Sequence, residues 1–447
     1  MQGVGLLILL LGAIVFIVFM TAKVRLHPFI VLLLTSLGVG LLAGLPAQQV
    51  ISAVTSGFGG TLGSIGIVIA AGTIIGFIME KSGAAVVMAN TILKLVGEER
   101  SALAMAFTGG VVSIPVFCDS GFVILSPLNR TLAERSKQSL SVFAISLSMG
   151  LYATHVFVPP TPGPIAAAGT LGADLGTVIL LGLLVSIPCI LAGYLFAKVY
   201  GSRIHIDPAP LGEETGVKEE KQKHYPSVLS SFAPIVVPVI LIALKSIADY
   251  PSKPFGTGGF QSFVSFIGNP NIALLIGVFL AFLTVKKLTG EVMHDWVALG
   301  LQNAGLIILI TGAGGSLGSV IRETPIADYL TTSLSGLQLG VFLPFLLAAA
   351  LKTAQGSSTV AIITTAGIVS PLLGALGLAG GIGPALTVLA IGAGAMTVSH
   401  ANDSYFWVVA QFSDMEVSQA YRLQTLGTLV TGIVGLIAVS ILYFLFV

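Results

Sequence analysis

Charged residues are scarce in this chain. Asp, Glu, Lys and Arg together make up 9% of its 447 residues, whereas they make up about a quarter of a typical soluble domain. The few charges nearly cancel, because 20 Lys and Arg stand against 19 Asp and Glu, for a formal net charge of +1. A balance this even indicates no nucleic-acid or strongly acidic partner.

Cysteine and the familiar catalytic motifs are also nearly missing. The two cysteines, Cys118 and Cys189, both lie in apolar segments, so we expect neither a disulfide framework nor a zinc site. The sequence has no Walker A loop, zincin helix or nucleophile elbow. These absences argue against an ATP-driven pump and against an enzyme, and we expect no cofactor or metal.

Apolar sequence is what the chain has in abundance. Hydrophobic residues make up 55% of it, and 54 residues are glycine. Several apolar runs reach the ~20 residues that span a bilayer, and glycine lets membrane helices pack closely. The run from Val4 to Met20 lacks a basic n-region and an A-x-A cleavage site, so we interpret it as a first span rather than a signal peptide. The sequence predicts an all-α polytopic membrane protein.

We predict about ten crossings, five in each half of the chain. Basic residues cluster in loops that would all face the cytoplasm if the N-terminus lies outside, as the positive-inside rule requires. These clusters are Lys23 and Arg25, then Arg130, Arg135 and Lys137, the polar segment 200–225, and Lys286 and Lys287. The predicted crossings are 4–22, 28–46, 61–80, 139–170 and 177–199, followed by 229–248, 271–286, 298–321, 383–412 and 421–446.

One apolar segment in each half cannot cross the membrane without spoiling this charge pattern. These are residues 101–130 and 339–373, and we interpret both as re-entrant helical hairpins. The stretches 83–100 and 323–335 are partly amphipathic and could lie along the membrane surface to join scaffold and hairpin.

Short matches recur in the same order in the two halves. Residues 71–76 (AGTIIG) resemble 313–318 (AGGSLG), Ser126-Pro127-Leu128 resembles Ser370-Pro371-Leu372, and Thr154-His155 resembles Ser399-His400. An odd number of crossings per repeat makes the halves inverted, as in many secondary transporters. We therefore expect a first repeat over 1–200, a polar cytoplasmic linker over 201–228, and a second repeat over 229–447.

Two predicted crossings, 139–170 and 383–412, contain residues that interrupt a helix. In the first, Thr154-His155 is followed by Pro159, Pro160, Thr161, Pro162 and Gly163; in the second, Ser399-His400 is followed by Asn402, Asp403 and Ser404. Proline has no N–H to continue a helix, and irregular backbone at membrane depth is tolerated only when it is buried or lines a cavity. Two such breaks, one per half, indicate a transporter substrate site, although a lone histidine is more often a satisfied buried group.

The tip of each predicted hairpin adds polar chemistry. Asp119 is an acid at bilayer depth, where an ionised group is costly, so it could carry a coupling proton or could act as a helix N-cap. The Gly356-Ser357-Ser358-Thr359 turn opens a helix and presents N–H groups and hydroxyls to an anion, unless it is a simple cap. Lys352 lies one turn earlier, and it either attracts a carboxylate or snorkels to the interface. Asp403 needs a positive neighbour or sodium to stay ionised, and otherwise a proton neutralises it.

At these residues the chain resembles the gluconate permease family of bacterial proton symporters, within the larger ion-transporter superfamily. The resemblance covers essentially the whole chain. It is carried by residues 59–63 (GGTLG), 121–123 (GFV), His155 with 159–164 (PPTPGP), 356–361 (GSSTVA) and 399–407 (SHANDSYFW). It implies uptake of a sugar acid or small hydroxy acid with protons across the bacterial cytoplasmic (inner) membrane. The hairpins and broken helices would then form a moving transport domain, with an elevator-like motion against a scaffold that forms a homodimer.

The sequence departs from the gluconate-type pattern inside the proposed site. The position of Thr161 is usually His, and the positions of Cys118, Asp119 and Ser120 usually hold an aromatic residue, an acid and an aliphatic residue. Other acids such as glycerate, fructuronate, idonate or D-serine therefore stay open.

We predict a proton symporter for a small organic acid anion. The predicted coupling-ion residues are Asp119 and Asp403, and the predicted substrate-binding residues are Ser120, Gly121, Thr154, His155, Thr161, Lys352, Gly356, Ser357, Ser358, Thr359, His400, Asn402 and Ser404.

Other functions compete with this prediction. Sodium could replace the proton, because hydroxyls, carbonyls and a carboxylate at a broken helix also form a cation site. A channel would show a continuous polar stripe, and a receptor would need a soluble output domain; the sequence has neither feature. Asp119 and Asp403 could mimic an intramembrane aspartyl dyad, but neither lies in a known protease motif.

Overall fold

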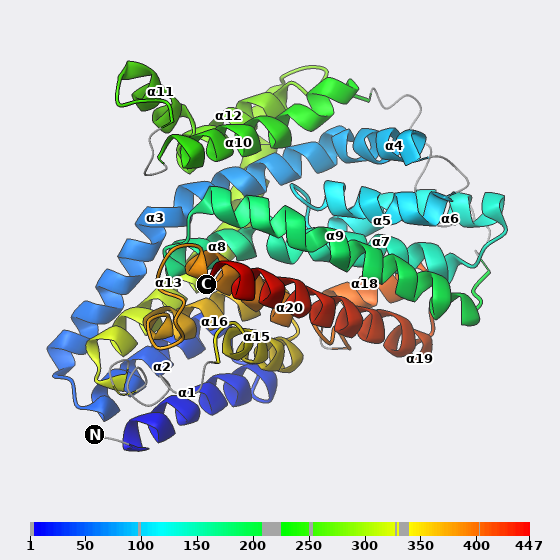
Figure 1. The fold of residues 1–447 in the computed structure, drawn as a ribbon. Helices are drawn as coiled ribbons and strands as arrows, with labels where there is room; N and C mark the ends of the chain where they lie inside the picture. The colour runs from blue at the N-terminus through cyan, green and yellow to red at the C-terminus, as the bar shows by residue number, and fades with distance from the viewer. Residues whose placement is uncertain are drawn as a thin grey trace.

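The computed structural model describes residues 4–96, 100–207, 225–249, 254–326, 329, 339–401 and 403–447. Within these ranges the chain folds into helices and forms no strand, which confirms the predicted all-α class. Helices α10 to α12 lie at the upper edge of Figure 1 and α1 and α2 at its lower left, while most of the other helices lie between them and to the right. The first-half helices are α1 (Val4–Ala22), α2 (Pro28–Ala43), α3 (Ala47–Ser82), α4 (Ala84–Val96), α5 (Ser101–Val112), α6 (Cys118–Ser136), α7 (Leu140–Phe157), α8 (Pro162–Leu171) and α9 (Leu175–Val199).

The second half repeats much of this order of elements. After α10 (Val228–Ala248) and the short α11 (Gly259–Ile267), the chain again forms a long helix, a helical hairpin, a broken helix and a final long helix. These helices are α12 (Pro270–Phe282), α13 (Val297–Glu323), α15 (Phe342–Gln355), α16 (Ser358–Val369), α17 (Gly383–Met396), α18 (Ser404–Phe412), α19 (Val417–Ala420) and α20 (Leu426–Phe446).

The described residues contain fewer full-length membrane helices than the ten crossings that we predicted. Six helical segments are long and apolar enough to cross a membrane, and one of them, Leu140–Leu171, includes α7, a break and α8. The number rises to eight if each of two bent pairs, within α3 and in α11–α12, counts as one span. The two remaining predicted crossings are 28–46 and 383–412. The first forms only the 16-residue α2, and the second is interrupted between α17 and α18, so neither provides a continuous span.

Both predicted hairpins are pairs of helices joined by a short interruption. In the first, α5 ends at Val112 and α6 begins at Cys118, and Pro115 lies in the intervening turn. In the second, α15 ends at Gln355 and α16 begins at Ser358, and Gly356 adopts the positive φ of 86° that favours glycine. Ser357 caps α16 by accepting a hydrogen bond from the Val360 N–H.

Both predicted broken helices are interrupted where Pro or polar residues accumulate. The first break separates α7 from α8 at residues 158–161, and the second separates α17 from α18 at residues 397–403. Around Ser399, the backbone N–H donates to the Thr428 hydroxyl at 3.0 Å and the carbonyl accepts from the Thr425 hydroxyl at 2.5 Å. Hydroxyls near the start of α20 therefore satisfy backbone groups that the break leaves unpaired at membrane depth.

Each hairpin packs on the broken helix of its own half through a glycine. A side chain at Gly150 of α7 would strike the Ala106 carbonyl of α5, and one at Gly394 of α17 would strike the Phe345 carbonyl of α15. These two close approaches fix the same relation between hairpin and broken helix in both halves.

The two long helices α3 and α13 pack on each other (Figure 1) and carry the AGTIIG and AGGSLG motifs. A side chain at Gly76 of α3 would strike Pro115 at the tip of the first hairpin, and a Cβ at Gly318 of α13 would lie 3.0 Å from the Gly367 carbonyl of α16. The repeated motif therefore lies where each long helix meets a hairpin.

Several smaller predictions have mixed outcomes. A short helix, α4, is present within the predicted amphipathic stretch 83–100. Most of the second predicted amphipathic stretch, 323–335, lies outside the described residues. The same is true of residues 208–224, which make up most of the predicted linker 201–228. Cys118 and Cys189 are both buried free thiols.

An ion pair joins segments far apart in the sequence. Arg130 of α6 binds both carboxylate oxygens of Asp414, which follows α18, at 2.5 and 2.8 Å.

Candidate functional site

The four helix interruptions come together in space. A Cβ at Gly163, just after the first break, would lie 3.7 Å from the Cα of Thr359 in the second hairpin. Ser404, at the second break, donates a hydrogen bond of 3.3 Å to Asp119 at the start of α6. Lys352 in the second hairpin contacts Asp403 in the second break. Each interruption thus contributes to one polar region inside the molecule.

A buried ion pair lies in this region. The Lys352 ammonium is 2.5 Å from Oδ2 of Asp403, and the two side chains are 0% and 6% exposed. Lys352 therefore does not snorkel to the interface. The positive neighbour that Asp403 would need to remain ionised is present, and it comes from a helix 51 residues away in sequence.

Further hydrogen bonds hold both members of the pair. Asp403 accepts from the Ser399 hydroxyl at 2.5 Å and, as the N-cap of α18, from the Tyr405 N–H at 3.1 Å. Lys352 also donates to the Gly356 carbonyl at the hairpin tip, and its ammonium lies 5.8 Å from the centre of the Tyr152 ring. A buried charge pair is tolerated when such additional bonds satisfy its remaining donors and acceptors.

Asp119 lies in the first turn of α6, whose N-cap is Phe117, so the N-cap alternative is wrong. A carboxylate in the first turn of a helix interacts favourably with the helix dipole. Besides the Ser404 hydroxyl, Asp119 contacts the Cys118 thiol at 3.6 Å. The next residue, Ser120, lies close to Glu80 near the end of α3, which brings a third acid to this hairpin.

The two histidines do not occupy equivalent environments. His155 is buried in the last turn of α7, its ring 6.1 Å from Phe117 and stacked 6.4 Å from Tyr152, and its Nδ1 has no hydrogen-bond partner among the described residues. His400 lies in the second break, where its Nε2 is 2.9 Å from the Thr353 carbonyl. The His155 ring therefore retains a free polar atom, whereas the His400 ring contacts backbone.

Several of the predicted hydroxyl ligands already donate hydrogen bonds within the protein. Thr154 donates to the Gly110 carbonyl at 2.7 Å, and Thr161 donates to the Val158 carbonyl at 2.6 Å. A side chain at Gly121 would contact Leu151 at 2.7 Å, so this position serves close packing of α6 on α7. Ser358 is buried at the start of α16. Asn402 lies outside the described residues.

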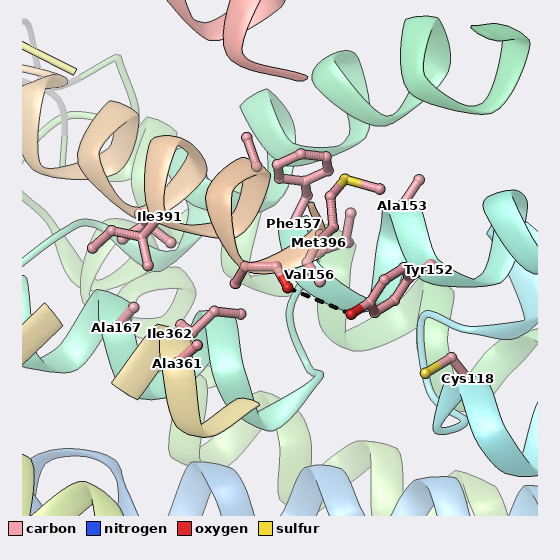
Figure 2. Packing of buried hydrophobic residues seen from close by; sticks show 14 of the residues in the cluster. Cys118, Tyr152, Ala153, Val156, Phe157, Ala167, Ala361, Ile362, Ile391 and Met396 are labelled. Carbon is pink, nitrogen blue, oxygen red and sulfur yellow. Dashed lines mark hydrogen bonds between the residues drawn. The ribbon is translucent and has the colours of Figure 1, made fainter. Parts of the chain in front are cut away.

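The structure adds residues to which the sequence analysis gave no role. Both amide atoms of Gln355, the last residue of α15, are buried without a hydrogen-bond partner among the described residues. Tyr152 is fully buried, and its hydroxyl donates to the Ala395 carbonyl at 3.4 Å, the bond dashed in Figure 2. Glu80 is the third addition. Gln355 directly precedes the Gly-Ser-Ser-Thr turn, and Tyr152 lies two residues before Thr154. Their proximity to these motifs is the one sequence feature that could have pointed to a role for either residue.

Apolar residues pack beside this polar region, since Tyr152 and Cys118 of the buried cluster contact Lys352 and Asp119. Figure 2 shows side chains of α7, α8, α16 and α17 packed together, among them Phe157, Ala167, Ile362 and Met396. A small cavity lies beside Thr161, lined by residues of α3, the first hairpin tip and the first break: Gly72, Thr73, Pro115, Phe117, Pro160, Thr161 and Pro162. The described side chains form no cluster of three or more potential metal ligands.

This arrangement can be compared with known proteins. The sequence pattern that defines the GntP family permeases matches residues 4–445. The chain belongs to the GntP permease family. It is 35% identical to the gluconate permease of Pseudomonas aeruginosa over 98% of this chain and 96% of that protein. It is 34% identical to the D-serine transporter DsdX of Escherichia coli strain K12 over 98% of both proteins.

The fold of this GntP-family chain is also similar to that of a solved transporter. The YdaH transporter of Alcanivorax borkumensis, described as having an unusual topology, aligns with a TM-score of 0.66 at 15% identity, over 94% of this chain and 99% of that one. The protein is thus a multi-pass membrane permease and not an enzyme. The family resemblance predicted from sequence is confirmed.

Proposed function

We propose that this permease is a secondary active transporter of the bacterial inner membrane that imports a sugar acid or a small hydroxy acid with protons. The buried Lys352–Asp403 pair is the observation that carries the proposal. A fully buried ammonium that already binds one carboxylate suits a substrate carboxylate of the same chemistry. An acid beside it provides a place for the coupling proton.

The roles of the remaining residues follow from their chemistry. The substrate carboxylate would meet Lys352 and the N-termini of α6, near Ser120 and Gly121, and of α16, near Ser358 and Thr359. The substrate hydroxyls would meet the free amide of Gln355 and Nδ1 of His155, because a buried polar atom without a partner gains most from a ligand. The hydroxyls of Thr154, Thr161 and Ser404 would have to exchange their present bonds.

Relatives support the substrate class without choosing within it. One relative is a gluconate permease and another is a D-serine transporter. Gluconate and D-serine share a carboxylate and at least one hydroxyl, and they differ in length and in the amino group. A lysine that binds the carboxylate could serve both substrates, so the groups around it would determine which acid this chain accepts. A D-serine-type amino acid is therefore the alternative substrate.

The transport cycle that we propose uses the repeated elements of the fold. The two hairpins and two broken helices would form a transport domain that moves as an elevator against a dimeric scaffold built around α3 and α13. The halves 1–200 and 229–447 would be inverted repeats. The recurrent order of elements and the glycine contacts at both hairpins support this proposal.

Ligand-induced stabilisation tests the proposed function and distinguishes proton coupling from sodium coupling. The apparent melting temperature of the detergent-purified protein would be measured with gluconate, idonate, glycerate, fructuronate and D-serine, at mildly acidic and mildly alkaline pH, with and without sodium. Binding to the folded state raises this temperature, by an amount equivalent to about 2.7 kcal/mol at a hundredfold excess over Kd. We expect a shift with at least one acid, larger at low pH and independent of sodium. A shift that requires sodium would overturn proton coupling, and no shift with any compound would contradict the proposed substrate class.

A further inference from the structure

We propose that the Lys352–Asp403 pair is an exchange switch, in which the substrate carboxylate replaces Asp403 on Lys352 and Asp403 takes up the coupling proton. This inference rests on the proposed transport of an acid with protons, and it assigns the coupling step to one carboxylate and fixes the charge that crosses the membrane.

The starting point is the isolation of the pair from water. Both side chains are almost completely buried, and the ammonium contacts Oδ2 of Asp403 directly. A buried pair is stable only while both partners are present, because removing one leaves an uncompensated charge in a medium of low polarity. A second carboxylate therefore cannot displace Asp403 from Lys352 and leave Asp403 ionised without a large cost.

Among the described residues, Lys352 is the only lysine or arginine that forms an ion pair with Asp403. The titratable groups that interact with it come from three elements besides α15. They are Cys118 and Asp119 on α6, Tyr152 and His155 on α7, and Tyr405 on α18. Asp119 bears the same sign of charge, so its presence further disfavours an ionised Asp403 once Lys352 is lost. A proton on Asp403 removes this cost.

The hydrogen bonds of Asp403 are compatible with both states. Ser399 donates to Oδ2, the oxygen that also contacts Lys352, whereas the Tyr405 N–H donates to Oδ1. A protonated Oδ2 can itself donate, and the Ser399 hydroxyl can turn to accept, since a hydroxyl serves in either role. The N-cap bond to Tyr405 remains in place throughout. The carboxyl group can therefore change its charge without losing its position at the start of α18.

The charge balance of the cycle follows. In the empty state the Lys352–Asp403 pair holds one ammonium and one carboxylate, which sum to zero, and Asp119 keeps the same charge throughout the cycle. In the loaded state the ammonium, the substrate carboxylate and the neutral acid of Asp403 again sum to zero. A site with substrate but no proton, or with a proton but no substrate, carries a net buried charge and is disfavoured. One proton therefore moves with each carboxylate, and uptake of a monovalent acid is electroneutral.

The wild-type protein in proteoliposomes tests this stoichiometry directly. Uptake of radiolabelled D-gluconate and D-glycerate would be followed to its plateau, with the membrane potential clamped by potassium and valinomycin. One proton per carboxylate predicts about tenfold accumulation for each pH unit of gradient, whatever the potential. Accumulation that depends on the potential would overturn the exchange switch while leaving acid transport in place. The absence of uptake for every acid would contradict the proposed function itself.

Variants identify the carboxylate. In Asp403→Asn the loaded site remains neutral while the empty site carries an unpaired ammonium, so we expect exchange of internal for external acid to persist and pH-driven accumulation to disappear. Asp249→Asn is the matched control, because Asp249 pairs with Lys245 at 2.5 Å at the exposed end of α10, outside the site. It should accumulate acid as the wild type does. Accumulation by Asp403→Asn that still follows the pH gradient would refute the assignment.

Folding is checked independently of transport. Replacing both members, in Lys352→Met with Asp403→Asn, removes the charges together, so this double variant should melt at least as high as the wild type. Lys352→Met alone should melt lower. Neither variant should be stabilised by an acid, because the ammonium is gone. Stabilisation of the double variant equal to that of the wild type would show that Lys352 does not bind the substrate carboxylate.

Discussion

Buried polar atoms without a partner mark the residues that folding alone does not explain. The amide of Gln355 and Nδ1 of His155 are such groups, and both lie beside elements that converge on Lys352. Leaving a buried polar group unpaired costs about 1–3 kcal/mol. The protein retains these groups despite the cost, as expected for residues that a ligand satisfies.

The first prediction concerns the Gln355→Leu variant. Removing an unpaired buried amide should leave the apparent melting temperature of the ligand-free protein unchanged or higher, because no hydrogen bond is lost. The apparent Kd for the transported acid should rise by about tenfold or more, since a ligand hydrogen bond worth about 1–3 kcal/mol is lost. A thermal titration of the purified protein measures both quantities.

Gln424→Leu provides the matched control. Gln424 is also a buried glutamine, and its Nε2 has no partner among the described residues, but its Oε1 accepts a hydrogen bond from Ser148 at 2.8 Å. Its replacement should lower the melting temperature, because Ser148 loses its partner, and should have a smaller effect on affinity. If Gln355→Leu lowers stability and leaves affinity intact, Gln355 is a structural residue and the prediction fails.

At the residue scale, the sequence identified the charged groups but could not pair them. Asp119, Lys352 and Asp403 stood out because charge is so rare in this chain. The contact between Lys352 and Asp403 depends on a hairpin meeting a broken helix, which no local pattern encodes. Gln355 and Tyr152 were not assigned because uncharged polar residues are common among membrane helices, and only burial and missing partners distinguish them.

At the scale of elements, close helix packing positions each hairpin against its broken helix. In the first half, a Cβ at Gly109 of α5 would lie 2.6 Å from the Leu147 carbonyl of α7, and Gly150 faces the backbone of α5 at Ala106. Backbones that approach this closely leave no room for a methyl group. The geometry of the candidate site therefore depends on glycines that contact only neighbouring helices.

The second prediction follows from this contact. Gly150→Ala should lower the apparent melting temperature by an amount equivalent to about 1–3 kcal/mol, because the two helices must separate. Gly305→Ala in α13 is the control, since an added Cβ there meets nothing within 4 Å and alanine favours a helix by about 1 kcal/mol. Equal melting temperatures for the two variants would show that the α5–α7 contact is not tight.

The sequence predicted most of the site-forming elements, but not the number of spans. Both hairpins and both breaks are present where charge distribution, proline and small polar residues indicated them. In the described residues, fewer of the predicted crossings form one long helix than expected, because apolar composition does not show where a helix ends. The predicted crossing 28–46 forms a helix only over Pro28–Ala43, which ends at the left-handed Gly44.

At the scale of the whole molecule, the interface between the long helices and the hairpins is the surface on which an elevator motion would occur. On the α13 side, Gly314 lies against Ile363 of α16 and Gly318 lies against Gly367. Glycines on the α13 face and Gly367 on the α16 face present little to interlock. The halves of the proposed transport domain are in turn joined by the Arg130–Asp414 pair.

The third prediction is that a cross-link over this interface stops transport. A Cβ at Gly314 would lie 3.4 Å from Cγ2 of Ile363, so the two positions are in contact and a cysteine pair there can be tested for a disulfide, whose Cβ atoms are about 3.5–4.5 Å apart. In a background with Cys118 and Cys189 replaced by serine, oxidation of the Gly314→Cys, Ile363→Cys variant should abolish uptake, and reduction should restore it.

Cysteines within the proposed scaffold serve as the control for this cross-link. Gly300 of α13 lies against Ile74 of α3, because a Cβ at Gly300 would lie 3.0 Å from the Cα and 3.2 Å from the Cγ1 of Ile74. Oxidation of the Gly300→Cys, Ile74→Cys variant should leave uptake intact, because α3 and α13 would move together. If the oxidised Gly314→Cys, Ile363→Cys variant takes up acid as fast as the reduced one, α13 and α16 do not move past each other and the elevator motion is contradicted.

Acid uptake driven by a proton gradient is the most direct test of the central claim. The purified protein would be reconstituted in sodium-free proteoliposomes, and accumulation of radiolabelled D-gluconate, D-glycerate and D-serine would be measured with the outside more acidic. We predict concentrative uptake of at least one of these compounds, abolished by a protonophore. Uptake that occurs only with a sodium gradient, or no uptake of any of them, would contradict the account.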